Sequence, residues 1–135
     1  MGWNPEAIKY VYEEGQVVYE EIIENDPLPE IPPLEMNIGF AWKFFNDRFV
    51  PELSLRYAAA QNRISESYGE QTTPAFTTIN LDLKYRFNSS LTVYAGVKNI
   101  FNAAYYEHLN RRIVGTMQPL YEPGRIFYAN LVFNL

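Results

Sequence analysis

Residues 77–87, TTINLDLKYRF, decide the fold of this chain. Every second side chain is apolar or aromatic, namely Ile79, Leu81, Leu83, Tyr85 and Phe87. The side chains between them are polar or charged, namely Thr78, Asn80, Asp82, Lys84 and Arg86. Because successive side chains of a β-strand point to opposite faces, this alternation predicts a strand with one apolar face and one polar face.

The same alternation recurs on both sides of this stretch. It predicts further strands at Leu34–Phe45, Glu52–Ala60, Leu91–Phe101 and Arg125–Leu135. The connections alternate in length, with short polar turns at 46–48 and 88–90 and longer loops at 61–74 and 107–124. Short turns at one end and long loops at the other are typical of outer-membrane barrels, although soluble up-and-down barrels also show them. The sequence therefore predicts an all-β chain, an antiparallel up-and-down meander of about six strands.

Composition supports strands and excludes several kinds of site. The 135 residues are 47% hydrophobic and 16% aromatic, with 11 Tyr and 9 Phe, and aromatic residues favour strands. The absence of Cys excludes disulfides, thiolate metal sites and Cys nucleophiles. No basic stripe is visible, so nucleic acid is not an expected partner. No apolar run is long enough for a spanning helix, but a barrel strand needs only about 9–11 residues.

Residues 1–33 are expected to be a separate acidic segment that precedes the strands of residues 34–135. Residues 1–35 contain nine acidic residues and one basic residue, whereas residues 36–135 carry a net charge of +3. The sequence fits a hairpin about Glu14-Gly15, with a helix over Pro5–Glu13 as the alternative. Residues 26–33, DPLPEIPP, contain four prolines and predict an ordered loop, because proline fixes φ and lacks a donor. The acidic side chains are interpreted as a solvated face, and attraction of cations is the alternative.

Two motifs in the last third of the chain resemble the closing strands of TonB-dependent outer-membrane receptors. The first is Asn99-Ile100-Phe101-Asn102, followed by Tyr105 and the pair His108-Leu109. The second is Pro123-Gly124-Arg125, directly before the last predicted strand. The proline-rich loop at 26–33 and the segments YAAAQNR (57–63) and TPAFTTINL (73–81) also resemble this family. The resemblance spans roughly residues 26–135, in the family's order.

This resemblance implies a bacterial outer-membrane receptor that imports a scarce nutrient, such as a ferric siderophore, cobalamin or another metal chelate. The family's barrel has 22 strands around a plug, so the chain is expected to be one part of a large transmembrane β-barrel, without the plug. The expected partners are outer-membrane lipid, TonB through an absent N-terminal region, the barrel-assembly machinery, and the small-molecule or metal-chelate substrate. Assembly signals usually end in an aromatic residue, whereas this chain ends in Leu135, and Phe133 is expected to serve instead.

Alternation and the family's topology together indicate which side chains line the lumen. The apolar faces are expected to meet lipid, and the long loops are expected to face the outside. The lumen-facing candidates are Glu35, Lys43, Arg56, Asp82, Lys84, Arg86 and Lys98.

No catalytic, metal or cofactor site is predicted, and the protein is not expected to be an enzyme. His108 is the only histidine, and no catalytic motif surrounds Ser65 or Ser67, its conceivable partners with Glu107. We interpret it as a loop-base residue with ordinary hydrogen bonds. The acidic residues of the N-terminal segment lack the spacing of a calcium loop. Glu52 and Asp82 lie on polar faces, where cross-strand ion pairs are expected rather than acid–base chemistry.

The alternative hypothesis is a small soluble all-β barrel that binds an apolar ligand, as lipocalins do. Such a barrel would be whole at 135 residues and would turn its apolar faces inward. It would therefore pack Leu81, Leu83, Leu131 and Phe133 together at its centre.

Overall fold

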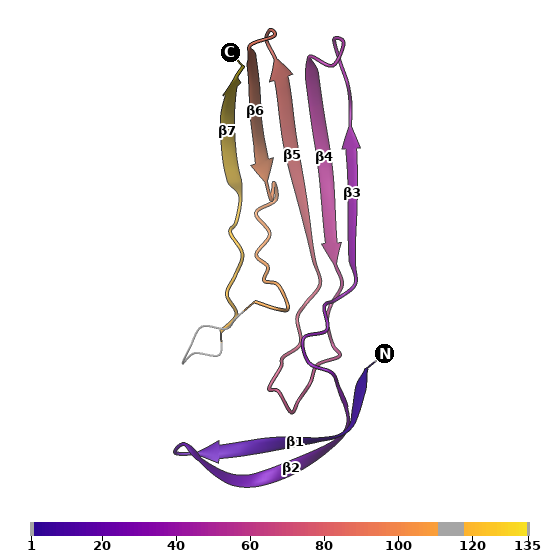
Figure 1. Cartoon of the computed structure of the whole chain (residues 1–135), viewed down its shortest axis with the longest axis vertical. Coiled ribbons are helices and arrows are strands. Elements are labelled where there is room, and N and C mark those ends of the chain that lie inside the picture. Colours follow the sequence, from indigo (N-terminus) through magenta and orange to yellow (C-terminus); the bar gives the residue numbers. More distant parts are fainter. Residues whose placement is uncertain (1, 111–117, 135) are drawn as a thin grey trace.

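Seven strands and no helix make up the described part of the computed structural model, residues 2–110 and 118–134. The strands are β1 (Trp3–Glu13), β2 (Gln16–Pro27), β3 (Glu35–Ala41), β4 (Phe49–Ala58), β5 (Phe76–Arg86), β6 (Leu91–Lys98) and β7 (Ile126–Phe133). β1 pairs with β2, and β3 to β7 form one antiparallel sheet in chain order (Figure 1). The predicted all-β antiparallel meander is confirmed, with one strand more than the six or so expected. No helix in these residues is long and apolar enough to cross a membrane, a finding that does not bear on strands.

The predicted strands are present, but some end earlier than the alternation suggests. β3 is continuous only to Ala41, although Trp42 and Phe44 still pair with Pro51 and Phe49 before the turn at residues 45–47, which adopts left-handed φ values of 53°, 55° and 61°. β6 stops at Lys98, where Asn99 adopts the left-handed backbone with a φ of 50°. Leu135, the predicted end of the last strand, lies outside the described residues, as do residues 111–117 of the predicted loop at 107–124.

The N-terminal residues form a hairpin, and the helix considered for Pro5–Glu13 is wrong. Cross-strand pairing outweighs the helical pattern, with Ile8 opposite Ile22 on the neighbouring strand. The turn between β1 and β2 consists of Glu14 (φ 50°) and Gly15 (φ 81°). Positive φ at both central residues is what a tight type I′ hairpin turn requires.

The register of the five-stranded sheet keeps apolar side chains on one face from edge to edge. One continuous row of directly opposed residues consists of Phe40, Leu53, Leu81, Val97 and Phe127. The next row, on the opposite face, consists of Ala41, Glu52, Asp82, Gly96 and Tyr128. The two faces of the sheet therefore differ in chemistry in the way the sequence predicts.

The apolar face has no core beneath it. Ala7 and Ala58 are the only buried hydrophobic residues in the described part of the chain. Leu131 and Phe133 are 63% and 66% exposed, and β3 and β7 are unpaired edges of an open sheet. This arrangement does not favour the small soluble barrel, which would enclose these side chains.

The short and the long connections lie at opposite ends of the sheet. The short β3–β4 and β5–β6 connections and the C-terminal end lie at one end (Figure 1). The longer β2–β3, β4–β5 and β6–β7 connections lie at the other end, together with the β1–β2 hairpin. The alternation of short and long connections predicted from the sequence thus places all long loops on one side.

On the polar face, Gly96 leaves no room for a side chain between itself and its neighbours. A Cβ atom there would lie 2.6 Å from the Tyr128 ring and 2.7 Å from the Leu81 carbonyl oxygen. At Gly39, also on this face, the nearest atom would be a Glu52 carboxylate oxygen at 3.8 Å.

We expect Gly96→Ala to lower the free energy of unfolding by about 1–3 kcal/mol, the usual cost of overpacking. Gly39→Ala is the matched control and should change that free energy by less than about 0.5 kcal/mol. Urea unfolding of the folded protein, followed by tryptophan fluorescence, measures both. Equal losses in the two variants would contradict the close approach at Gly96.

Candidate functional site

Six of the seven lumen-facing candidates lie in strands and share the polar face of the sheet. The pairing register places these six residues on one face, because each lies opposite another residue of that face or two positions from one along its own strand. The six are Glu35, Arg56, Asp82, Lys84, Arg86 and Lys98. Lys43 differs, because it lies beyond the end of β3 and forms an exposed ion pair with Asp47 at 3.6 Å.

Arg56 is the centre of an ionic cluster at the loop end of the polar face. Its guanidinium contacts a Glu35 oxygen at 2.9 Å and a Glu107 oxygen at 2.5 Å. It also lies over the Phe76 ring, 5.3 Å from the centroid, and Phe76 stacks on Tyr105 at 4.3 Å. A guanidinium between two carboxylates forms strong, directional hydrogen bonds. The cluster therefore fixes residue 107 of the last long loop against β3 and β4.

Tyr105 is half-buried beside this cluster. Burial raises the pKa of its phenol above the ordinary value of 10.0, and the negative charges of Glu122 and Glu107 raise it further. Arg56 opposes this shift but does not cancel it. Tyr105 is therefore a neutral packing partner, not an acid–base group, at physiological pH.

A second cluster surrounds Asp82 in the middle of the polar face. Lys98 contacts both carboxylate oxygens, at 2.8 and 3.0 Å, and the Tyr128 hydroxyl donates to the same carboxylate. The Lys98 ammonium also lies 5.6 Å from the centre of the Tyr128 ring. The expected cross-strand pairing is thus found for Asp82. No ion pair within the described residues includes Glu52.

The family-motif residues hold turns and contact one another. Asn99 accepts from the Ala103 N–H and donates to the Ala103 carbonyl, both at 2.9 Å, which closes the turn after β6. Asn102 accepts from the backbone N–H of Arg125 at 2.8 Å, directly before β7. The two motifs are 21 residues apart in sequence from Asn102 to Pro123, yet they meet in space. Phe101 is 73% exposed, so it has no role in this contact.

The loops at this end are tied together by one buried carboxylate, which sequence reasoning missed. Asp26, at the end of β2, is 2% exposed. It accepts from the hydroxyls of Ser65 and Ser67, both at 2.6 Å, and from the Glu66 N–H at 2.9 Å. These contacts bind the hairpin to the 59–75 loop. The only hint of this contact in the sequence is the Ser-Glu-Ser triplet, which is too unspecific to indicate a partner.

The pKa of Asp26 reflects these hydrogen bonds. Burial alone raises the pKa of the Asp26 carboxyl. The hydrogen bonds from Ser65, Ser67 and the Glu66 N–H lower it by more, so its pKa lies below the ordinary 3.8. The ionised carboxylate is therefore the form that holds the loop.

His108 does not take part in a hydrolytic triad. Its Nδ1 contacts the Thr73 hydroxyl at 2.8 Å. Ser65 and Ser67 donate to Asp26 instead, and Glu107 accepts from Arg56. The ordinary hydrogen bond expected of a loop-base residue is present at Nδ1, whereas Nε2 is buried without a partner.

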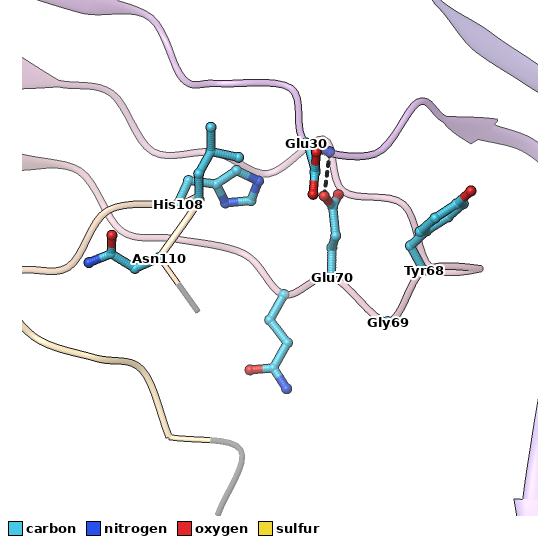
Figure 2. A pocket seen from close by; sticks show the side chains of 8 residues that line it. Glu30, Tyr68, Gly69, Glu70, His108 and Asn110 are labelled. Atoms are coloured by element: carbon cyan, nitrogen blue, oxygen red, sulfur yellow. Dashed lines mark hydrogen bonds between the residues drawn. The ribbon is translucent and has the colours of Figure 1, made fainter. Parts of the chain in front are cut away.

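The same loops line an open pocket of about 240 Å³ (Figure 2). Its walls come from three segments: Glu30 before β3, residues 68–71 between β4 and β5, and residues 108–110 after β6. The described residues contain no group of three or more His, Cys, Asp or Glu positioned for a metal ion. The arrangement has the chemistry of a polar binding surface, with carboxylates, amides and one imidazole.

Comparison with known proteins matches most of the chain to one family model. The family model described as "TonB dependent receptor-like, beta-barrel" matches residues 2–100. The heme transporters BhuA of Brucella ovis and of Brucella suis biovar 1 are each 25% identical to this chain over 144 residues. That similarity covers 98% of this chain and 21% of each transporter.

The fold is similar to that of the solved copper transporter OprC, with a TM-score of 0.72 and 27% sequence identity. This similarity covers 85% of this chain and 19% of OprC. The chain therefore spans about a fifth of the length of the relatives it matches. The family match begins at residue 2, so it includes the acidic hairpin as well as β3 to β6.

Asp26→Asn should loosen the 59–75 loop. We expect the local stability of that loop to fall by about 1.5–3 kcal/mol, since a buried carboxylate loses charge-assisted hydrogen bonds. Hydrogen exchange at the Glu66 amide measures it. Asp47→Asn, which breaks an exposed pair with Lys43, should leave this amide unchanged. Unchanged exchange in Asp26→Asn would show that Asp26 does not stabilise the 59–75 loop.

The stability that the Asp26 hydrogen bonds give to the 59–75 loop should also depend on pH in a defined direction. Because the pKa of Asp26 is lowered in the folded state, its contribution is fully present above the ordinary 3.8 and is lost as pH falls further. Exchange at Glu66, corrected for the intrinsic rate, should therefore be constant from pH 7 to about 5. Below the ordinary 3.8 it should accelerate, and loss of protection near neutral pH would contradict this assignment.

Gly124 and Asn102 should be energetically coupled. A Cβ at Gly124 would lie 2.4 Å from the Asn102 side-chain oxygen. Gly124→Ala should cost about 1–3 kcal/mol of unfolding free energy alone, and clearly less when Asn102 is already alanine. A double-mutant cycle gives the coupling, which we expect to exceed about 0.5 kcal/mol. Additive effects would show that the two motifs are independent.

Proposed function

Because the chain belongs to the TonB-dependent receptor β-barrel family, we propose that it is part of a receptor that imports a scarce nutrient through a β-barrel. The family match covers residues 2–100, well over half of the chain. Proteins of this family lie in the bacterial outer membrane, and so does this chain. The sheet β3 to β7 would form a stretch of the barrel wall.

The register of the apolar face carries this proposal. A row of apolar side chains crosses all five strands, and Phe40 and Phe127 at its ends are 59% and 71% exposed. A soluble protein rarely leaves so large a contiguous apolar surface uncovered. In a barrel wall the same surface meets hydrocarbon, and only the opposite face needs polar side chains.

The polar face would then line the lumen. Its clusters around Arg56 and Asp82 pair charges with charges, which suits a water-filled or plugged interior. Lys84 and Arg86 are in no ion pair within the described residues. We expect these two cations to contact the plug, which the rest of the receptor would supply. Lys43, outside the strands, would lie at the rim.

The long loops would face the outside, because outer-membrane barrels place short turns in the periplasm. The substrate would first contact the β4–β5 and β6–β7 loops and the β1–β2 hairpin. Candidate substrates are a ferric siderophore, cobalamin or another metal chelate. Heme and copper, for which the relatives BhuA and OprC are named, join this set.

The partners and the lack of catalysis are part of the same proposal. TonB would supply energy through an N-terminal region of the receptor, and the barrel-assembly machinery would recognise the last strand, with Phe133 as its aromatic residue. No catalytic arrangement is needed for import, and the named relatives are transporters. We therefore propose that the protein is not an enzyme.

Uptake tests the proposed function directly. The full receptor would be expressed in a bacterial strain that lacks its own receptors, with and without functional TonB. Labelled ferric siderophores, heme, cobalamin and copper would be offered separately. We expect one substrate class to accumulate only with both receptor and TonB. Accumulation that is equal with and without functional TonB, or no accumulation of any of these substrates, would count against the proposal.

Arginine substitution tests which face meets lipid. Leu81→Arg should lower the free energy of unfolding in lipid vesicles by about 2–4 kcal/mol, the cost of a cation near the bilayer midplane. Asn80→Arg, one residue earlier on the polar face, is the matched control and should cost clearly less. Similar costs at the two positions would contradict the assignment of the faces.

A further inference from the structure

Two arginines oppose each other on neighbouring strands at the turn end of the sheet, where the β3–β4 and β5–β6 connections lie (Figure 1). The Arg86 N–H donates to the Arg48 carbonyl oxygen at 2.8 Å, which continues the β4–β5 pairing by one residue. Arg48 and Arg86 are therefore directly opposed. Like charges in such positions of a sheet are destabilising, so this pair costs free energy unless an anion neutralises it.

The two guanidinium groups lie in the same region. The Arg48 guanidinium donates to the Phe87 carbonyl oxygen at 3.2 Å, directly after β5. The Arg86 guanidinium donates to the Asn46 carbonyl oxygen at 3.3 Å, in the turn that also contains Arg48. Each guanidinium thus contacts the segment from which the other side chain starts. The two positive charges therefore meet between the β3–β4 turn and the end of β5.

The surroundings of this pair add positive charge and little negative charge. Lys84 lies two residues before Arg86 on the same face of β5, and its Nζ is 5.9 Å from the centre of the Tyr94 ring. Asp47 is the only acidic residue of the β3–β4 connection, and it is paired with Lys43 at 3.6 Å. No ion pair within the described residues includes Lys84 or either arginine.

An oxyanion fits this arrangement. Each guanidinium has several N–H donors and uses one of them for a backbone carbonyl within the described residues. Guanidinium groups bind carboxylate and phosphate groups through paired, charge-assisted hydrogen bonds. An anion with two or more oxygens can accept from both arginines at once, which replaces their repulsion by two attractions. A metal ion or an amine would be repelled, and both arginines are exposed, so a ligand has access to them.

We propose that Arg48 and Arg86 bind one oxyanion between them, a carboxylate or a phosphate group, with Lys84 as an additional positive charge. The inference rests on the proposed function for the source of the oxyanion. The carboxylate would come from the plug, and the phosphate group from a small molecule on the periplasmic side. The site itself rests on the register and on the contacts of the two arginines.

Thermal unfolding of the full receptor in detergent, titrated with inorganic phosphate at constant ionic strength, tests the proposal. A ligand that binds only the folded state raises the unfolding midpoint. If a free phosphate group is the ligand, millimolar phosphate should raise the midpoint. Arg86→Gln should then weaken the apparent affinity for phosphate by about tenfold or more, the size of one charge-assisted hydrogen bond. Glutamine still has an amide that can donate to the Asn46 carbonyl.

Lys9→Gln is the matched control. It removes the same charge from the β1–β2 hairpin, where Lys9 lies 3.9 Å from a Glu21 carboxylate oxygen. The response of this variant to phosphate should equal that of the unmodified receptor. An equal loss of the response in Lys9→Gln would show a general charge effect and overturn the proposal.

A carboxylate of the receptor itself would give a different result, because the site would already be occupied. Phosphate would then leave the midpoint unchanged, whereas Arg48→Gln and Arg86→Gln should each lower it. The double variant should lower the midpoint no further than the more affected single variant, since both arginines hold one anion. Separate losses of the two carbonyl contacts would instead be additive.

Three further results would overturn the proposal. One is a phosphate response that Arg86→Gln leaves unchanged. The other two apply if phosphate has no effect: additive losses in the double variant, or single variants with an unchanged or higher midpoint, as relief of repulsion between two hydrated guanidinium groups predicts.

Failure of the proposed function is separable from these outcomes. A receptor that imports its substrate with TonB but gives one of the overturning results would lose only the oxyanion site. A receptor that binds phosphate through Arg86, or shows the non-additive losses, but has no TonB-dependent uptake would lose only the import function.

Discussion

The strand register of the five-stranded sheet is the constraint on which the rest of the structure depends. Because side chains alternate with a period of two, a shift of one residue in any pair would move a whole strand's apolar set to the polar face. Four successive pairings, from β3–β4 to β6–β7, all keep the same assignment. The result is a wall with two chemically different sides and no core between them. Such a wall fits the proposed barrel, in which the apolar side would meet hydrocarbon and the polar side would line the lumen.

The placement of the charged residues follows from the two different faces of this sheet. Arg56 and Lys98 lie on the side that would be wet, and each finds its carboxylate partners on neighbouring strands or on a loop. Glu107 links the last long loop to the strands, and Asp26 links the hairpin to the loop between β4 and β5. The loop end is therefore organised by carboxylates that accept several hydrogen bonds each. That organisation gives the loop end a fixed surface on a wall of regular strands.

The family motifs gain a physical meaning from the same contacts. The Asn99–Asn102 turn and the Pro123–Arg125 turn touch through the Asn102 side chain and the Arg125 backbone. One turn ends β6 and the other leads into β7, so their contact sets where the last strand begins. Residue identity matters here because Gly124 leaves room for Asn102. These residues therefore act on the architecture of the sheet, because they set where its last strand begins.

The sequence by itself determined the strands, their faces and the alternation of short and long connections, because each depends on a local period of two and on turn residues nearby. It also indicated the family, through motifs read in order. It did not indicate that Asp26 would meet Ser65, that Glu107 would meet Arg56, or that Nε2 of His108 would be left without a partner. Those contacts join loops whose residues lie about 40 to 50 positions apart in sequence, namely 39 for Asp26 and Ser65 and 51 for Arg56 and Glu107. Only the tertiary structure decides them, because loop side chains have no periodicity and their partners depend on how the strands place the loop ends.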